Sequence, residues 1–422
     1  KFGTGMVKVT PAHDLTDWEM GRRHKLKIVK VIDERGKMTK ASKICEGLSP
    51  LECREKVLAE LEKDNLLEKT ESYIHSRPYC SRCGTLIEPL PSKQWFLKMS
   101  ELAKVAISAV QSGKIKFVPK NFEKIYFDWL KNIRDWCISR QLWWGHKIPL
   151  EGETDVLDTW FSSALWPFAT LGWPEETKDL KTFYPTNVLS TARDIINLWV
   201  ARMIFSGMEF MKEIPFSKVI IHPTVLTKEG KRMSKSLGTG IDPVNLCEKY
   251  GADATRFGIS WQLMGGQDIH FIEDNIAMGR KFCNKIWNAS RFVLMQISPK
   301  EIFKFPTKKI SFEVNDLTAA DKKILNSLNK TIKSVDKSLE NFQFGAAARG
   351  LYDFFWHDFC DLYIEKAKDQ KNKKTTQKIL LYVLLSSLKL LHPFIPFITE
   401  EIYQKLPLKD KKKFLMIEDW PK

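Results

Sequence analysis

The chain has 422 residues with a formal net charge of +16, and hydrophobic residues make up 43% of it. This composition excludes an intrinsically disordered or fibrous protein, and the length predicts two or three domains, because a single core rarely grows beyond about 300 residues. The longest apolar stretch, 379–391, is interrupted by Lys389 and is too short to cross a bilayer, so we expect no membrane partner.

The positive charge comes from 67 lysines and arginines against 51 acidic residues. Such an excess is typical of proteins that bind a polyanion such as nucleic acid, although a lysine-rich proteome explains it equally well. The eight cysteines are scattered except for one pair, which predicts free thiols in a reducing cytoplasm rather than a disulfide framework. No signal peptide opens the chain, and because it starts at Lys1 without a methionine, we expect the natural N-terminus to lie upstream.

The N-terminal part contains short β-like runs and one clear helix signal. Residues 6–9 follow a glycine-rich turn and are a strand candidate. Residues 49–52, Ser-Pro-Leu-Glu, have the capping-box pattern with proline at the first helical position, which predicts a helix running to about Leu67. We expect this helix to bury its apolar side chains, namely Leu51, Val57, Leu58 and Leu61.

The remainder of the chain changes character near Asp274. Residues 155–265 alternate strand and helix patterns, with a buried strand expected at 217–221 and a helix at 195–211, which indicates an α/β layer. Beyond Asp274, apolar residues recur at spacings of three and four, at Ile324, Leu328, Ile332, Val335 and Leu339. With further helices expected at 275–297, 345–368 and 376–391, this half predicts a helical bundle.

Residues 230–238 carry the strongest chemical signal, because they combine two serines, three cations and flanking glycines directly after the expected strand. Lysine ammonium groups, serine hydroxyls and backbone N–H groups can all stabilise charge on a phosphate leaving group. A solvated basic turn is the alternative that charge alone does not exclude. Other phosphate motifs are excluded: no G-x-x-x-x-G-K-[ST] occurs, and Gly3-x-Gly5 lacks the third glycine of a dinucleotide loop.

The segment Arg232-Met233-Ser234-Lys235-Ser236 resembles the K-M-S-K-S signature of class I aminoacyl-tRNA synthetases, and residues 241–243 and 250–257 also match that family. The resemblance implies a partial Rossmann-like parallel sheet, an α/β fold, followed by an all-α anticodon-binding bundle. It also implies ATP as substrate with Mg2+ on its phosphates. The catalytic residues would then be Lys235, which contacts the phosphates, together with Ser234 and Ser236. The ATP-binding residues would be Asp194, His222, Met233 and Lys235.

Two further segments are similar to the valine-specific members of this family. Residues 135–146 and 155–163 look like the stretches that carry two tryptophans walling an aliphatic pocket. That role maps to Trp144 and Trp160, with Val156 between them, and rigid aromatic walls can exclude larger side chains. Residues 341–347, 351–361 and 391–401 resemble the anticodon-binding bundle. The implied partners are valine, ATP and tRNA(Val), and an isoleucine or leucine enzyme is the alternative within the family.

Residues 3–17 are similar to the end of the editing domain that valine, isoleucine and leucine enzymes carry. A hydrophobic pocket cannot strongly reject threonine in favour of valine, for which the valine enzymes are the established example, so a second, hydrolytic site is needed. The resemblance implies that Asp17 binds the α-ammonium group of the mischarged amino acid, and that Lys8, Thr10 and Asp14 belong to the editing site. His13 is either a general base or a residue that ties the loop together.

A structural zinc site is a further possibility. Cys80 and Cys83 supply half of a four-ligand set, and His75 is a candidate third ligand. Some relatives carry a second cysteine pair after the segment matching 145–149. Here Pro149 is followed almost directly by the segment 155–158, so the chain looks shortened at 149/150 compared with the family. Zn2+ is therefore a candidate cofactor with an incomplete site.

The family's H-x-G-H motif is absent, and Ala192 stands where a glycine normally allows close approach of ATP. We therefore expect a synthetase fragment that is inactive alone, monomeric and cytoplasmic. The expected layout is the end of the editing domain at 1–40, a connective region at 41–130, the second half of the catalytic domain at 131–274 and the anticodon-binding domain at 275–422. A non-catalytic tRNA-binding or deacylating relic is the alternative from another functional class.

Overall fold

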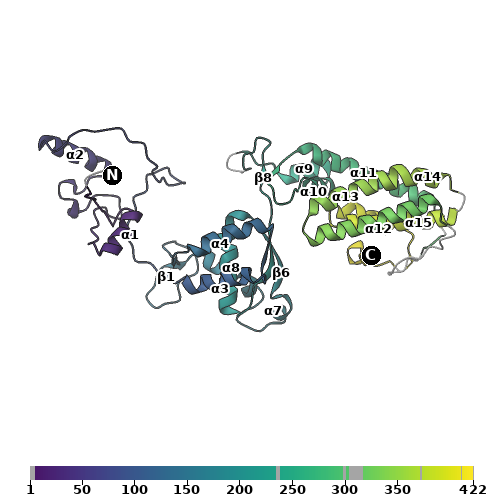
Figure 1. Ribbon diagram of the computed structural model, residues 1–422, viewed down its shortest axis with the longest axis horizontal. Coiled ribbons are helices and arrows are strands. Elements are labelled where there is room, and N and C mark those ends of the chain that lie inside the picture. The colour runs from purple at the N-terminus through teal and green to yellow at the C-terminus, as the bar shows by residue number, and fades with distance from the viewer. Residues whose placement is uncertain are drawn as a thin grey trace. The chain divides into compact units, whose positions relative to one another are not determined.

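The structure is a computed structural model, and it contains two compact units (Figure 1). The first comprises Lys1–Phe96 with Cys137–Ser139, and the second comprises Leu97–Trp136 with Arg140–Lys422. The four-segment layout expected from the sequence remains a prediction. The residues that the structure describes are 5–233, 238–297, 301–303, 317–370, 373–409 and 411–421.

The first unit has little regular structure. Helix α1, Leu15–His24, begins where the Asp14 carboxylate accepts the Asp17 N–H at 2.8 Å. Helix α2, Pro50–Lys63, has the predicted capping box, but it ends four residues before Leu67. None of its side chains is buried, so the expectation of a buried face is wrong. The helix packs against the 3-10 segment η1, Lys40–Cys45, which is too small to cover the apolar side chains. Residues 6–9 form no strand.

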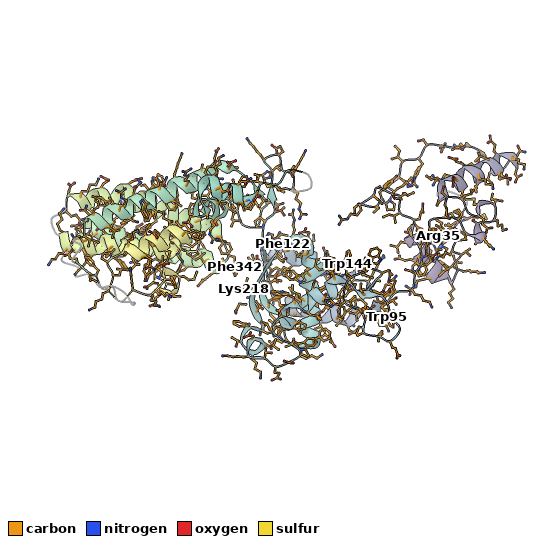
Figure 2. The ribbon with its side chains drawn as sticks, turned by 180° about the vertical axis from the view of Figure 1, so that it is seen from behind. Arg35, Trp95, Phe122, Trp144, Lys218 and Phe342 are labelled. Carbon is orange, nitrogen blue, oxygen red and sulfur yellow. A yellow bond between two sulfur atoms is a disulfide. The ribbon has the colours of Figure 1, made fainter. Side chains whose placement is uncertain are left out.

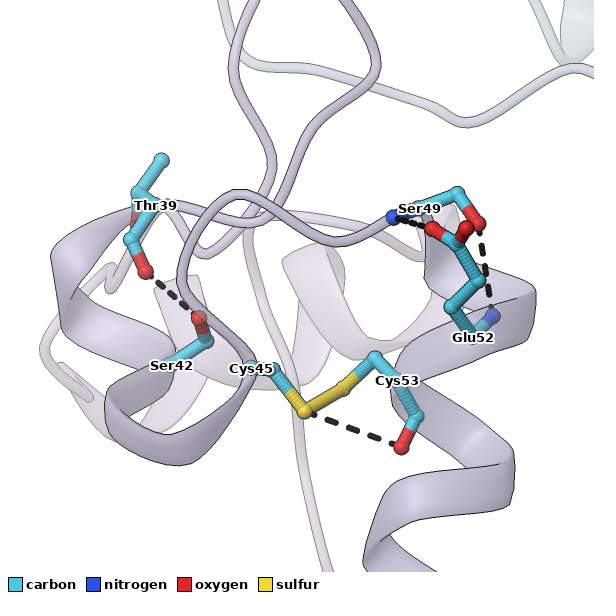
Figure 3. Close-up of a disulfide and its surroundings, with 6 residues drawn as sticks. All are labelled: Thr39, Ser42, Cys45, Ser49, Glu52 and Cys53. Atoms are coloured by element: carbon cyan, nitrogen blue, oxygen red, sulfur yellow. Dashed lines mark hydrogen bonds between the residues drawn. A yellow bond between two sulfur atoms is a disulfide. The ribbon is translucent and has the colours of Figure 1, made fainter.

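Cys45 and Cys53 form a disulfide between η1 and α2 (Figure 3). The prediction of free thiols is therefore wrong for these two cysteines. The turn between the segments brings the two Cα atoms to 5.2 Å, a separation that a disulfide can span. A sequence spacing of eight residues does not reveal this proximity, because it depends on how the 3-10 turn folds back onto the helix. The cysteines that carry free thiols are Cys80, Cys83, Cys137, Cys247, Cys283 and Cys360.

A three-stranded parallel sheet forms the centre of the α/β part of the second unit. Its strands are β2 (Lys116–Val118), β7 (Phe216–Ile221) and β6 (Thr186–Thr191), in the order β2-β7-β6. Val219 is fully buried in the central strand, so the buried strand predicted at 217–221 is confirmed. Nearby helices are α3 (Ser100–Gln111), α4 (Glu123–Lys131) and α8 (Ala201–Phe210). The helix predicted at 195–211 is confirmed, although it begins with the π-helical turn η4, Ile196–Val200.

Short elements complete this part. The strands are β1 (Phe96–Leu97), β3 (Trp136–Cys137), β4 (Ser139–Arg140), β5 (Val156–Leu157), β8 (Val225–Leu226) and β9 (Ile269–His270). The helices and 3-10 turns are η2 (Lys120–Phe122), α5 (Thr159–Ala164), α6 (Trp166–Ala169), α7 (Lys178–Phe183), η3 (Arg193–Ile195), α9 (Pro243–Tyr250) and α10 (Ala252–Trp261).

The C-terminal half is the predicted helical bundle. Its elements are α11 (Glu273–Met295), α12 (Ala319–Glu340), α13 (Phe344–Asp353), the π-helix η6 (Phe354–Ile364), α14 (Glu365–Lys368), α15 (Lys373–Leu391), α16 (Pro396–Lys405) and η7 (Leu415–Ile417). The apolar stripe of α12 packs into one hydrophobic core with the other helices, as its spacing predicts. Within the described residues, no helix combines the length and apolarity needed to cross a membrane.

Helix α10 joins the α/β part to the bundle. Two of its side chains form hydrogen bonds with backbone groups of the bundle. The buried Asp253 carboxylate accepts the N–H groups of Phe397 and Ile398, at 3.2 and 2.7 Å. Arg256 donates to the carbonyls of Phe394 and Pro393, at 3.1 and 2.9 Å. A second link is a cation–π contact, in which the Lys218 ammonium group of β7 lies 5.2 Å from the Phe342 ring centroid (Figure 2).

Candidate active site

The carboxyl ends of strands β6 and β7 carry a cluster of polar side chains. The His222 N–H donates to the Thr191 carbonyl at 3.0 Å, so the two chain segments stay paired as they leave the sheet. Asp268 connects the segments that follow the two strands. It accepts the N–H of Thr224, after β7, at 3.0 Å, and it forms an ion pair with Arg193, after β6, at 2.9 Å. Ligands of open parallel sheets bind at this edge, so the cluster marks the candidate nucleotide site.

A β-hairpin leads from this edge into the R-M-S-K-S motif. The Thr227 N–H donates to the Lys231 carbonyl at 2.7 Å, and Leu226 and Arg232 form an antiparallel bridge. Gly230 closes the turn at φ +80°, a conformation that favours glycine. A Cβ atom there would also lie 3.3 Å from the His270 ring, so space is tight for any larger residue. The hairpin stem therefore holds Arg232, the first residue of the motif, beside the sheet.

Arg232 and Asp194 connect the hairpin with the sheet. The guanidinium lies 3.2 Å from the Asp194 carboxylate, 38 residues away in the sequence. The pKa of Asp194 is lowered, first by its own backbone N–H and then by Arg232. Both side chains are largely exposed, so the ion pair adds little stability but is free to exchange its partner for a ligand.

The structure describes only part of the predicted ATP site. Asp194 and His222 lie at the same strand ends, and Met233 is half-buried at the end of the hairpin stem. Lys235, Ser234 and Ser236 lie outside the described residues, so their roles remain predictions. Sequence reasoning missed Arg193 and Asp268 as members of this cluster, and it did not foresee the pairing of Arg232 with Asp194. Their partners are 38 and 75 residues away, and no local pattern reveals pairs at such distances.

The predicted amino-acid pocket centres on Val156, which is buried. A Cβ atom on Gly145 would lie 2.9 Å from a Val156 methyl, so the chain beside Trp144 packs directly on this valine. Trp144 is 79% exposed, whereas Trp160 is half-buried. Figure 2 labels Trp144. The pocket assignment stays a prediction, because one of its two tryptophans is exposed and the other is half-buried.

A buried carboxylate organises the base of this region. Asp158 accepts the Trp136 indole N–H at 2.9 Å, pairs with Arg140 at 3.0 Å and accepts the Trp160 N–H at 3.4 Å as the N-cap of α5. The Arg202 guanidinium lies 4.0 Å from the Trp136 ring centroid. Burial lowers the pKa of Arg202 to about 10, and Asp158 opposes that shift. One carboxylate thus holds the start of the helix that presents Trp160.

The segment resembling an editing site folds around Thr10. Asp17 accepts both the Thr10 N–H at 2.7 Å and the Thr10 hydroxyl at 3.0 Å, and these two hydrogen bonds lower the pKa of Asp17. Both contacts use the same carboxylate oxygen. Asp14 caps α1, and Lys8 is exposed. The editing roles of these four residues remain predictions.

His13 ties distant loops together. Its Nε2 accepts the Val31 N–H at 3.0 Å, so the proton sits on Nδ1, which donates to the Pro89 carbonyl at 3.0 Å. Both ring nitrogens are occupied by backbone groups. The interpretation of His13 as a loop-tying residue is therefore supported over the general-base alternative.

The cysteine pair forms a tight turn without a full ligand set. The Cys80 N–H donates to the Thr85 carbonyl at 2.8 Å, and the Thr85 hydroxyl, 3.2 Å from the Cys83 sulfur, lowers the pKa of that thiol to about 7. Zinc requires four ligands, and no group of three or more candidate ligands occurs in the part of the chain that the structure describes. Two thiols alone do not fit a structural zinc ion.

The shortened segment at 149/150 forms a closed hairpin. Lys147 and Val156 make an antiparallel bridge, the Ile148 N–H donates to the Asp155 carbonyl at 3.1 Å, and the Leu157 N–H donates to the His146 carbonyl at 2.7 Å. The short connection therefore pairs the start of strand β5, at Val156, with the chain at Lys147.

Comparisons with known proteins agree with this architecture. A profile of class I tRNA synthetases (I, L, M and V) matches residues 22–152 and 150–272, meeting at the short hairpin, and a profile of the anticodon-binding domain of tRNA ligase matches 321–422. Valine–tRNA ligases from Clostridium tetani and Thermotoga maritima are 48% and 47% identical over the whole chain. The chain spans about half the length of these curated relatives, 51% in both cases.

Solved structures support the fold alone, because their sequence identity is low. Methionyl-tRNA synthetase from Mycobacterium tuberculosis, bound by methionyl-adenylate, has a TM-score of 0.61 and 17% identity over 78% of this chain and 66% of its own. A LeuRS–tRNA–LeuAMS complex from Agrobacterium radiobacter has a TM-score of 0.53 and 17% identity over 96% of this chain and 48% of its own. With the sheet, the hairpin motif and the helical bundle in place, the chain belongs to the class I tRNA synthetases of the isoleucine, leucine, methionine and valine group.

Proposed function

We propose that the chain is part of a valine–tRNA ligase, which joins valine and ATP into valyl-adenylate and transfers the valyl group to tRNA(Val). The observation that carries this proposal is the 47–48% identity over the entire chain with curated valine–tRNA ligases. Mg2+ accompanies the ATP phosphates, and the protein acts as a monomer in the cytoplasm.

In this mechanism the chain's contribution to adenylate formation is electrostatic. ATP lies at the ends of β6 and β7 beside Asp194, His222 and Met233. Lys235 approaches the phosphates from the hairpin and neutralises the charge that grows on pyrophosphate as it leaves. Ser234 and Ser236 donate hydrogen bonds to the same oxygens. Fixed cations and donors of this kind stabilise a transition state without reorganisation.

Amino-acid selection and editing follow from the two remaining clusters. Trp144, Val156 and Trp160 line a slot whose size excludes isoleucine, and a slot of this kind admits threonine. The editing residues then hydrolyse threonyl-tRNA. The Asp17 carboxylate pairs with the α-ammonium group through the oxygen that does not contact Thr10, while Lys8, Thr10 and Asp14 shape the site.

The decisive experiment is ATP–pyrophosphate exchange by the complete gene product that contains this chain. We expect exchange with valine to exceed exchange with isoleucine or leucine by about 100-fold, the discrimination that one methylene allows. Stronger exchange with isoleucine or leucine would assign another member of the group. No exchange, together with no H-x-G-H motif encoded upstream of Lys1, would establish the non-catalytic alternative.

The isolated 422-residue chain provides an internal control for this assay. Its sequence contains no H-x-G-H motif, so we expect no measurable exchange from it with any amino acid. Turnover by this chain alone would show that the ATP site is complete without that motif.

The Asp17→Asn variant of the complete protein tests the editing assignment. Because an amide cannot pair with an ammonium group as a carboxylate does, we expect hydrolysis of threonyl-tRNA to slow by at least about tenfold. Valine-dependent exchange should stay within about twofold, since it occurs at a different site. The matched control is Asp33→Asn, because Asp33 also accepts backbone N–H groups in a nearby turn. Normal deacylation by Asp17→Asn would remove Asp17 from the editing site.

A further inference from the structure

The loop at residues 262–268 contacts the chain after each of the three strands of the parallel sheet, and we call it the strand-end loop. It lies between α10 and β9, and Gln262 holds it there. The Gln262 side chain donates to the Gly258 carbonyl of α10 at 2.9 Å and accepts the Ile272 N–H, after β9, at 2.8 Å. The loop is therefore anchored to the helix before it and to the chain after β9.

The first contact of the strand-end loop is with the chain directly after β2. Gly266 has φ +88°, and a Cβ atom there would lie 2.3 Å from the Pro119 ring. Pro119 follows Val118, the last residue of β2. Glycine is the residue that permits both this backbone conformation and so close an approach. The strand-end loop therefore lies directly on the end of β2.

The Asp268 carboxylate makes the contacts with the chain after β6 and after β7, and it uses a different oxygen for each. Oδ1 accepts the Thr224 N–H at 3.0 Å, and Oδ2 accepts an N–H of the Arg193 guanidinium at 2.9 Å. The Asp268 side chain is 22% exposed, so water competes little for these two contacts. A carboxylate that accepts from two donors at once holds them at a fixed separation.

Each of these two donors adjoins a part of the candidate nucleotide site. Arg193 directly precedes Asp194, and Thr224 directly precedes β8, the first strand of the hairpin that leads into the R-M-S-K-S motif. The Ile269 N–H donates to the Thr224 carbonyl at 2.9 Å, so both backbone groups of that threonine are held by the chain at the start of β9. Asp268 therefore fixes the base of the hairpin relative to Asp194.

The ion pair between Arg232 and Asp194 is a second connection between the same two segments, but its surroundings differ. Both of its side chains are largely exposed, and an incoming ligand can replace either partner. The Asp268 carboxylate is more buried and also accepts a backbone N–H. A nucleotide that separates Arg232 from Asp194 therefore leaves the connection through Asp268 in place.

We propose that Asp268 is a positioning residue for adenylate formation, because it holds the base of the hairpin at a fixed distance from Asp194 through Thr224 and Arg193. This inference rests on the proposed function and adds to it a residue that touches no substrate. A displacement of about 1 Å at a reacting group can cost about 100-fold in rate, so a contact at the base of the hairpin affects the chemical step. The partners of Asp268 belong to the nucleotide edge, so valine binding should not change.

Three variants of the complete protein remove the contacts of Asp268 separately and together. Asp268→Asn keeps an acceptor for the Thr224 N–H but places an amide nitrogen against Arg193. Arg193→Gln removes the same ion pair from the other side, and Asp268→Ala removes both contacts. We expect valine-dependent ATP–pyrophosphate exchange at saturating substrates to fall about tenfold in the first two variants and about 100-fold in Asp268→Ala. The KM for valine should stay within about twofold in all three.

Combination and rescue variants test whether Arg193 acts through Asp268. Because Asp268→Asn and Arg193→Gln break the same contact, the double variant should lose no more than about tenfold. The pair uses one N–H of the guanidinium, so a lysine ammonium can replace it, and Arg193→Lys should stay within about threefold of the unmodified protein. Multiplied losses in the double variant would show that the two residues act independently and would overturn the proposal.

Glu273→Gln is the matched control. Glu273 pairs with Lys249 at 2.8 Å and accepts the Tyr250 hydroxyl, so its partners lie on α9 rather than at the strand ends. Its exchange rate should stay within about twofold. Active-site titration by the burst of adenylate normalises each rate to the folded fraction, which removes any loss caused by unfolding alone. Normalised rates in Asp268→Asn and Asp268→Ala that equal that of Glu273→Gln would overturn the positioning role.

Amide hydrogen exchange on the 422-residue chain tests the same geometry without an activity assay. Peptides covering 224–232 should exchange faster in Asp268→Ala than in Glu273→Gln. Equal exchange would show that Asp268 does not hold the hairpin, and the inference would fail while the proposed function stands. If the unmodified complete protein catalyses no valine-dependent ATP–pyrophosphate exchange, the proposed function fails, and the positioning role fails with it.

Discussion

Gly345→Ala is expected to lower the free energy of unfolding of the helical bundle by about 3 kcal/mol, the upper part of the range for overpacking. A Cβ atom on Gly345 would lie 2.0 Å from the Leu263 carbonyl oxygen, which is backbone and cannot rotate away. The nearby Arg349 side chain donates to the Trp261 carbonyl at 2.7 Å, so α13 is held against the end of α10. The added methyl group must push these two elements apart.

Gly350→Ala on the same helix is the matched control. Nothing lies within 4 Å of a Cβ atom at Gly350, so the substitution should raise the free energy of unfolding by about 0.5–1 kcal/mol through helix propensity. Urea unfolding followed by circular dichroism measures both effects. If Gly345→Ala unfolds at the same urea concentration as Gly350→Ala, the close approach of α13 to Leu263 is not present in solution.

Asp158→Asn is expected to destabilise the α/β part by about 2–3 kcal/mol. The substitution preserves the shape of a side chain that is 4% exposed, but it removes the charge that pairs with Arg140 and faces the buried Arg202. Removing one member of a buried ion pair leaves an uncompensated charge, and the exposure of Arg140 reduces the loss. In the complete protein, the KM for valine should rise while the KM for ATP stays the same, because Asp158 caps the helix that carries Trp160.

Asp155→Asn is the control for Asp158. Asp155 contacts the Gln141 side chain at 2.8 Å near the surface, and its substitution should cost less than about 0.5 kcal/mol. Amide hydrogen exchange measured by mass spectrometry can locate the effect: peptides covering 136–140 and 156–164 should lose protection in Asp158→Asn alone. Equal protection in both variants would mean that Asp158 does not organise this region.

Elements with a strong local pattern were predictable from the sequence. The α12 stripe repeats apolar residues with helical spacing, and the strand at 217–221 ends in a continuous apolar run, so burial of these residues follows directly. The exposure of the apolar side chains of α2 was not predictable in this way. Its apolar residues have helical spacing, but the surrounding segment provides no second surface to cover them. Periodicity indicates which face would be buried, and tertiary structure decides whether anything covers it.

The candidate site divides in a similar way. The R-M-S-K-S motif was visible as a contiguous run, and the structure describes its first two residues, Arg232 and Met233, after the strand β7. The Arg232–Asp194 and Arg193–Asp268 pairs were not visible, because each joins residues that meet only after the strands align. The Cys45–Cys53 disulfide was missed for the same reason, although the two residues are close in sequence. Loop geometry, rather than spacing, brings them together.

The bridge between Lys147 and Val156 has a consequence for how this family can vary in length. The two ends of the connection lie directly opposite each other, so a module of any size could be spliced between them without displacing either strand. The entropic cost of closing a loop grows only slowly with its length, so lengthening this loop would cost little stability. The same position therefore offers an attachment point for a reporter peptide.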